Sequence, residues 1–172
     1  MPPDAEASYD PVPVLELFAK HGIDFVVIGG VAVGVHGSSY GTFDVDLAYA
    51  RDRDNLVRIA KLLRSIGATL RGAPPEVPFQ LDELSLEAGG NFTFSTSYGA
   101  IDLLAYPAGG PPYEALRRRA TVIDIHGHSV RVASIDHLIA MKEAAGRPQD
   151  KLHAMELRQI SDELRAPRGD AA

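Results

Sequence analysis

The chain has 172 residues, a mass of 18.5 kDa and a formal charge of −6, from 17 basic and 23 acidic residues. A chain of this length most easily forms one domain around one core, so we expect a single domain over residues 1–172, with flexible tails at 1–10 and 167–172. The acidic balance disfavours a protein that coats nucleic acid. The absence of cysteine excludes disulfides and thiolate zinc sites.

The chain shows no targeting or membrane signal. Its N-terminus lacks the basic start and apolar run of a signal peptide, and no apolar stretch approaches the roughly 20 residues that cross a bilayer. We therefore expect a cytoplasmic protein without membrane contact. The one dense basic run, Arg117 to Arg119, fits either a solvated helix face or a phosphate-contacting patch.

The first half of the chain predicts alternating helices and strands from its apolar periodicity. In order, these are a helix over 13–21, a buried strand over 23–28, a short helix over 31–36, a strand over 43–49 and a helix over 55–66. Asp54 is positioned to cap the last helix. Gly29 and Gly30 separate the first strand from the short helix.

The second half predicts a loop-like start over 72–90, followed by strands and helices. In order, these are strands over 92–96 and 101–106, a helix over 113–119, a hairpin of 121–125 with 129–132, and helices over 135–145 and 151–164. Strands interspersed with helices and hairpins indicate an α+β fold, a mixed β-sheet flanked by helices and completed by C-terminal helices.

Asp44 and Asp46 are the first candidate functional residues. Side chains two apart on a strand point the same way, so both carboxylates share one face, and Phe43, Val45 and Leu47 are expected to face the core. Two carboxylates about 4 Å apart repel by roughly 4 kcal/mol at an effective dielectric of 20. A divalent cation relieves that repulsion, and all-oxygen ligation suits Mg²⁺ or Mn²⁺.

Such a pair also occurs on ordinary surface strands, but three further features favour a site. Gly29 and Gly30 lack the Cβ that would keep a phosphate from backbone N–H groups at a helix start. Thr42 offers a hydroxyl beside the first carboxylate. Asp102 stands in an otherwise apolar strand, where an unpaired carboxylate is costly. Three carboxylates on adjacent strands can hold two metal ions for in-line phosphoryl transfer, with Asp102 as general base or as a ligand of the second metal.

The stretch from Gly29-Gly30-Val31-Ala32-Val33 through His36-Gly37 to Thr42-Phe43-Asp44-Val45-Asp46-Leu47 resembles the signature of the DNA polymerase β-type nucleotidyltransferase superfamily. The likeness is closest to the small branch that includes AbiEii- and MenT-like toxins, and it extends to the stretch from Met141 to Asp150. The resemblance implies transfer of a nucleoside monophosphate from an NTP to a hydroxyl, such as a tRNA 3′ end, a protein side chain or a small molecule. A toxin of this kind would have a cognate antitoxin as its partner.

The resemblance also implies roles for individual residues. Asp44, Asp46 and Asp102 would be the catalytic, metal-binding carboxylates. The nucleotide would be bound by Gly29, Gly30, Thr42, Lys142, Arg147 and Asp150. Three of these have simpler interpretations: Lys142 as a solvent-exposed lysine, Arg147 as a loop cation and Asp150 as the N-cap of the last helix.

One position departs from the pattern of this branch, because Tyr40 stands where an arginine is common. This change and the small size of the chain motivate a second hypothesis, a catalytically inactive nucleotide-binding or antitoxin-like module of the same fold. A third hypothesis is a soluble domain whose acidic strand is merely surface. The histidines form no metal set: His36 is expected to be packed or hydrogen-bonded, and His126 and His128 to be exposed beside a turn.

Overall fold

The computed structural model describes residues 9–39, 41–74 and 76–167. The strands are β1 (Phe25–Ile28), β2 (Asp44–Tyr49), β3 (Thr69–Leu70), β4 (Asn91–Thr96), β5 (Gly99–Leu104), β6 (Thr121–Ile125) and β7 (His128–Val132). The helices are α1 (Val12–Lys20), α2 (Gly29–Val35), α3 (Arg53–Ser65), α4 (Glu83–Ala88), α5 (Tyr113–Arg119), α6 (Ile135–Ala145) and α7 (Pro148–Arg165). Most of the two predicted tails, and Tyr40, lie outside the described residues.

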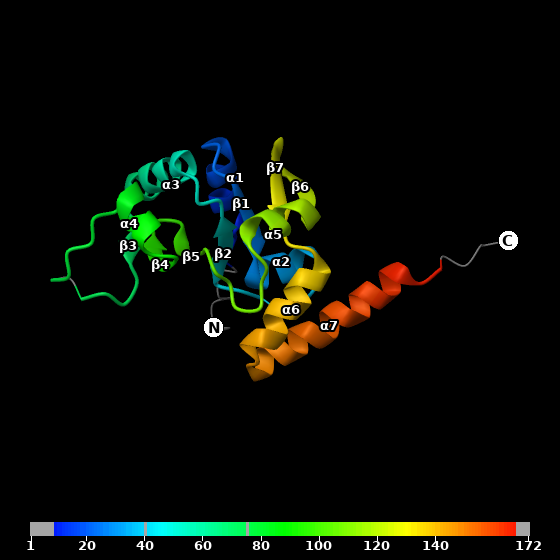
Figure 1. Ribbon diagram of the computed structural model, residues 1–172. Coiled ribbons are helices and arrows are strands. Elements are labelled where there is room, and N and C mark those ends of the chain that lie inside the picture. The colour runs from blue at the N-terminus through cyan, green and yellow to red at the C-terminus, as the bar shows by residue number, and fades with distance from the viewer. Residues whose placement is uncertain (1–8, 40, 75, 168–172) are drawn as a thin grey trace, which may run out of the picture.

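The strands form one seven-stranded sheet in the order β3-β4-β5-β2-β1-β7-β6. The pairs β1–β7 and β2–β5 are parallel, and the other neighbours are antiparallel. Helices flank this mixed sheet, and α6 and α7 complete the chain at one end (Figure 1). The predicted α+β fold with C-terminal helices is therefore confirmed.

One face of the sheet carries the hydrophobic core. Val45 and Leu47 of β2, Ile101 and Leu103 of β5, and Phe94 of β4 are all buried, as period-two alternation requires. They belong to a single apolar cluster with the buried faces of α1 and α3. The residues between them, including Asp44, Asp46 and Asp102, therefore project from the opposite face.

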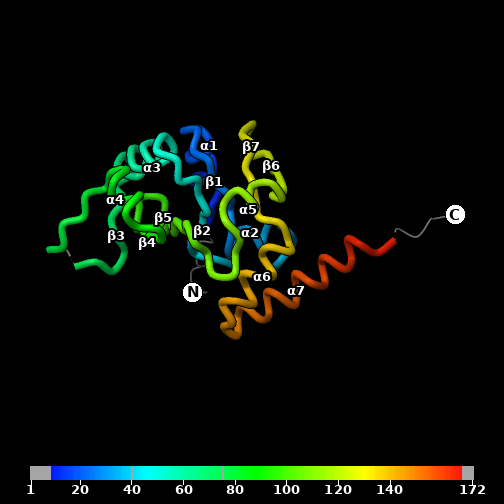
Figure 2. The backbone as a smooth tube through the Cα atoms, in the orientation of Figure 1, coloured from blue at the N-terminus to red at the C-terminus, as the bar shows by residue number. Residues whose placement is uncertain are grey.

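The opposite face is covered unevenly. Helix α2 contacts β1 and β2, and α6 contacts α2 and α7. At the other end of the sheet, Thr69, Arg71, Thr93 and Ser95 are exposed. Figure 2 shows β3, β4 and β5 on the side of the molecule away from α6 and α7. The carboxylates thus lie where a helix-covered part of this face meets an open part.

Several local predictions were wrong. Phe43 is 73% exposed because it precedes β2, so the alternation of the strand does not extend to it. The cap of α3 is Asp52, whose side chain accepts the backbone N–H of Asn55, and not Asp54. The stretch 72–90 is loop-like at first, as predicted, but it then contains α4, which was not predicted and begins at an Asp82 cap.

The last helix also starts earlier than predicted, at Pro148, because proline suits the first helical turn. Asp150 is therefore a first-turn residue and not the N-cap, which is Arg147. No helix in the described ranges is long and apolar enough to cross a membrane.

Candidate active site

Asp44, Asp46 and Asp102 meet on one face of the sheet. In the parallel pair of β2 and β5, Asp46 lies directly opposite Asp102, and Asp44 stands two residues earlier on β2. One carboxylate oxygen from each residue can be chosen so that all three lie within 4.8 Å of one another. The structure therefore brings the three predicted carboxylates together, which removes the interpretation of an unconnected acidic surface strand.

The cluster is electrostatically strained without a cation. Burial, followed by the charges of Asp44 and Asp102, raises the pKa of Asp46 to about 7. Burial also raises the pKa of Asp102, although the Arg71 guanidinium opposes that shift. Three oxygen donors that repel one another fit a hard divalent cation, which would remove the repulsion.

The glycine pair lets α2 approach the carboxylates. Gly29 has a left-handed φ of +67°, and a Cβ there would collide with the carboxylate of Asp46. A Cβ on Gly30 would lie 2.8 Å from Cβ of Thr42, and the Thr42 hydroxyl donates to Oδ1 of Asp44 at 3.0 Å. The glycines are thus required by close packing against the site, in addition to the phosphate contact expected from the sequence.

Asp150 ties together the two cations predicted for nucleotide binding. Its side chain is fully buried; Lys142 Nζ lies 3.3 Å from Oδ1, and Arg147 Nε donates to Oδ2 at 2.6 Å. The Lys142 side chain is only 11% exposed, so its interpretation as a solvent lysine was wrong. The Arg147 side chain is 72% exposed. Hydrogen bonding from Arg147 lowers the pKa of Asp150, which keeps this residue anionic.

A polar pocket of about 390 Å³ adjoins these groups. Its lining is Gly30, Gly41, Thr42, Phe43, Asp44, Asp46, Asp102, Lys142, Arg147, Gln149 and His153. A neighbouring pocket of about 350 Å³ shares Asp46, Lys142 and Arg147 with it and adds Gly29 and Asp150. Every predicted site residue therefore lines one of two adjoining pockets.

Two residues of this region were missed from the sequence. Arg71, just after β3, forms an ion pair with Asp102. His153, buried on α7, lines the polar pocket, and burial lowers its pKa. Only the fold connects Arg71 to the carboxylates. His153 is separated from Asp150 by the i, i+3 spacing of one helix face, which was a signal in the sequence.

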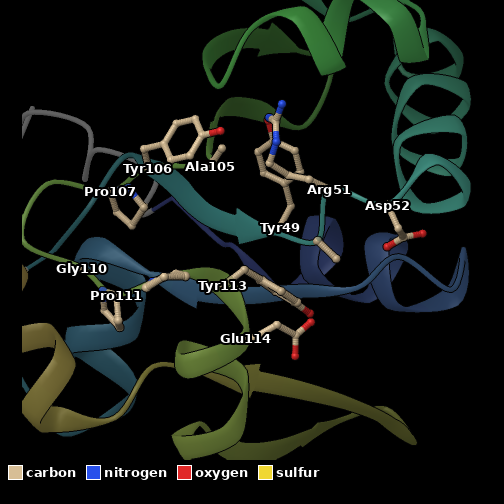
Figure 3. A pocket seen from close by; sticks show the side chains of 12 residues that line it. Tyr49, Arg51, Asp52, Ala105, Tyr106, Pro107, Gly110, Pro111, Tyr113 and Glu114 are labelled. Atoms are coloured by element: carbon tan, nitrogen blue, oxygen red, sulfur yellow. The ribbon is translucent and has the colours of Figure 1, made fainter.

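A third pocket, of about 480 Å³, lies next to the 350 Å³ pocket (Figure 3). Tyr49, Arg51, Tyr106 and Tyr113 contribute to its walls, and none of the predicted site residues lines it. Arg51 Cζ lies 5.9 Å from the ring centre of Tyr49 and 5.6 Å from that of Tyr106. Tyr106 also lines the 350 Å³ pocket, so the two cavities share a wall.

Solved structures share this architecture. The lincosamide antibiotic adenylyltransferase LnuA, bound to lincomycin, aligns with a TM-score of 0.59 and 16% identity over 86% of this chain and 94% of that chain. A Thermotoga maritima protein described as a nucleotidyltransferase aligns with a TM-score of 0.51 and 13% identity over 88% of this chain and 92% of that chain. ANT(2″)-Ia in complex with adenylyl-2″-tobramycin aligns at 0.51 with 15% identity over 88% and 85%.

No family model and no curated protein matches the sequence. At these identities the structural likeness establishes the fold, which is that of the nucleotidyltransferases. The AbiEii- and MenT-like branch within that fold has no support among these neighbours.

The raised pKa of Asp46 predicts how metal-free stability depends on pH. Because the pKa of Asp46 is higher in the folded state than in the unfolded chain, protonation of this carboxyl stabilises the fold. That stabilisation is fully present below the ordinary pKa of 3.8 and is lost as pH rises through about 7. In EDTA, Asp46→Asn should be more stable than the wild type at pH 8 by on the order of 1–4 kcal/mol, and close to it at pH 4. Urea unfolding at both pH values measures this, and parallel pH profiles for the two proteins would contradict it.

The buried Asp150 predicts a large effect on stability. Asp150→Ala leaves Lys142 without its buried partner and removes the bond to the N-terminus of α7, so we expect a loss of about 3 kcal/mol. Asp162→Ala, an exposed carboxylate on the same helix, should change stability by no more than about 0.5 kcal/mol. Thermal and urea unfolding of the wild type and the two variants measure these losses. Equal losses of unfolding free energy in both variants would contradict the stabilising role of Asp150.

Proposed function

We propose that this protein is a metal-dependent nucleotidyltransferase that transfers a nucleoside monophosphate from an NTP to a hydroxyl acceptor. The observation that carries the proposal is the meeting of Asp44, Asp46 and Asp102 beside a polar pocket in a nucleotidyltransferase fold. A coarse likeness of fold does not imply an activity, but here the fold comes with a set of oxygen donors suited to its chemistry.

The three carboxylates would hold Mg²⁺ or Mn²⁺, which supplies charge neutralisation at the phosphates and lowers the pKa of a bound hydroxyl. Thr42 holds Asp44 through its 3.0 Å hydrogen bond and so fixes one ligand. Lys142 and Arg147 present positive charge at the pocket wall, each oriented by Asp150. These cations and the backbone around Gly29 and Gly30 would receive the triphosphate.

In the reaction, the acceptor oxygen bonds to the α-phosphorus as the bond to the bridging oxygen of pyrophosphate breaks. The acceptor proton leaves toward Asp102 in its role as general base, or toward solvent if Asp102 is only a ligand. Asp102 adjoins the open part of the sheet, where Thr93 is exposed, so an acceptor would approach it there past the Arg71 side chain. This positioning, together with charge neutralisation, is the main requirement of phosphoryl transfer.

The proposal has two more specific forms, which differ in the class of molecule that accepts the nucleoside monophosphate. The sequence resemblance suggests a tRNA 3′ end or a protein, with the chain as the toxin of a toxin–antitoxin pair. The structural neighbours LnuA and ANT(2″)-Ia are antibiotic adenylyltransferases or antibiotic-resistance factors and suggest a small hydroxyl compound instead. The charge of −6 weighs against extended contact with nucleic acid, which favours the small acceptor or a single nucleic-acid end.

Calorimetric titration with Mn²⁺ and each NTP tests the proposal. The wild type should bind an NTP only with the metal present, and Asp44→Ala and Asp46→Ala should lose at least about a hundredfold in affinity or transfer rate. Asp54→Asn, an exposed carboxylate outside the pocket, is the matched control and should behave as wild type.

Metal-dependent NTP binding without transfer to any RNA, protein or small-molecule acceptor would favour the inactive nucleotide-binding module. Retention of activity in Asp44→Ala and Asp46→Ala would refute the nucleotidyltransferase proposal.

A further inference from the structure

A row of cross-strand neighbours leads from the sheet edge to the carboxylates. Arg71, directly after β3, donates its backbone N–H to the carbonyl of Thr93 at 2.9 Å. Thr93 on β4 lies opposite Asp102 on β5, and Asp102 lies opposite Asp46 on β2. Residues opposite one another project from the same face, so Arg71, Thr93, Asp102 and Asp46 form one row from the end of β3 across β4 and β5 to β2.

The Arg71 side chain follows this line inward. Thr93, a short side chain, stands between Arg71 and Asp102 in this row, and the Arg71 guanidinium forms an ion pair with Asp102. The pair is partly shielded, with 39% of the Arg71 side chain and 17% of the Asp102 side chain exposed. Among the ion pairs of residues 9–39, 41–74 and 76–167, this is the one that reaches the carboxylate cluster, because Lys142 and Arg147 pair with Asp150.

We infer that Arg71 is a positioning residue whose guanidinium neutralises Asp102 and competes with the divalent cation for this carboxylate. The inference rests on the proposed function, since it concerns the same metal-binding carboxylates. An arginine side chain stays protonated at any working pH, so pH does not relieve this competition. A cation that binds all three carboxylates must either displace the guanidinium or share Asp102 with it.

The sign of the effect separates this role from a merely structural one. If Arg71 only supported the fold of the site, its removal would disorder Asp102 and weaken metal binding. If Arg71 competes, its removal takes a positive charge away from the neighbourhood of a doubly charged ion and strengthens binding. Coulomb's law for charges several ångströms apart, screened near a protein surface, gives roughly a three- to thirtyfold effect.

Titration of the full chain with Mn²⁺ in the absence of nucleotide tests the inference. Arg71→Gln should bind Mn²⁺ about three- to thirtyfold more tightly than the wild type, and Arg71→Lys, which keeps the charge, should stay within about threefold of it. Arg64→Gln is the matched control: Arg64 on α3 donates to the carbonyl of Leu81 at 2.6 Å, in the segment between β3 and α4 that begins with Arg71, but it pairs with none of Asp44, Asp46 and Asp102. Its Mn²⁺ affinity should be unchanged.

A double-mutant cycle with Asp102→Asn completes the design. In that background the effect of Arg71→Gln on Mn²⁺ affinity should be clearly smaller, because the competed ligand is gone and only the repulsion between the Arg71 charge and the ion remains. Thermal unfolding of each variant verifies that it is folded.

The outcomes separate the inference from the proposed function. Mn²⁺ binding that requires Asp46 but is unchanged or weakened by Arg71→Gln overturns the inference alone. Absence of Mn²⁺ binding in every folded variant overturns the proposed function, and this inference with it.

Discussion

Parallel pairing of β2 with β5 places Asp46 directly opposite Asp102, and the two carboxylates repel each other. Much of the rest of the site compensates this repulsion. The register is fixed on the other face, where Val45, Leu47, Ile101 and Leu103 are buried in the core. A one-residue slip of β2 would bury Asp44 and Asp46 and expose Val45 and Leu47, which is prohibitive, and a slip of β5 would do the same to Asp102, Ile101 and Leu103. The hydrophobic core therefore enforces an arrangement that the carboxylates alone would not adopt.

The C-terminal helices supply the positive charge on the opposite wall of the pocket. Asp150 is buried between Lys142 of α6 and Arg147 at the start of α7, so one carboxylate fixes the position of two cations and joins two helices. The exposures of the two cations differ sharply. Lys142 is held inside the structure, whereas most of the Arg147 side chain stays in solvent at the mouth of the pocket. This asymmetry suits Lys142 to a fixed contact and Arg147 to one that forms as a ligand enters.

The sequence was sufficient for the elements with strong periodicity and for naming the three carboxylates, because both follow from local patterns, whereas the meeting of Asp46 with Asp102 depends on the pairing of β2 with β5. The pair Asp44 and Asp46 needs only a strand, and Asp102 is conspicuous in an apolar segment. Local pattern failed at boundaries: Phe43 lies one residue outside β2, and Pro148 opens α7 before the predicted start. It also failed for Arg71, whose link to Asp102 depends on the pairing of β3 with β4 and of β4 with β5. Non-local register is not encoded in any single window of sequence.

The formal charges of the site suggest an order of binding. Asp44, Asp46, Asp102 and Asp150 are set against Arg71, Lys142 and Arg147, which leaves a slight negative excess when all are ionised. A triphosphate, itself strongly anionic, would meet Asp44 and Asp46 at the same pocket wall as the cations. Partial protonation of Asp46, whose pKa is raised to about 7, lessens the repulsion but also weakens a ligand. A divalent cation held by Asp44, Asp46 and Asp102 would instead neutralise the carboxylates and the charge of the incoming phosphates together. Under the proposed function, these charges favour entry of the nucleotide together with its metal over entry of the free nucleotide.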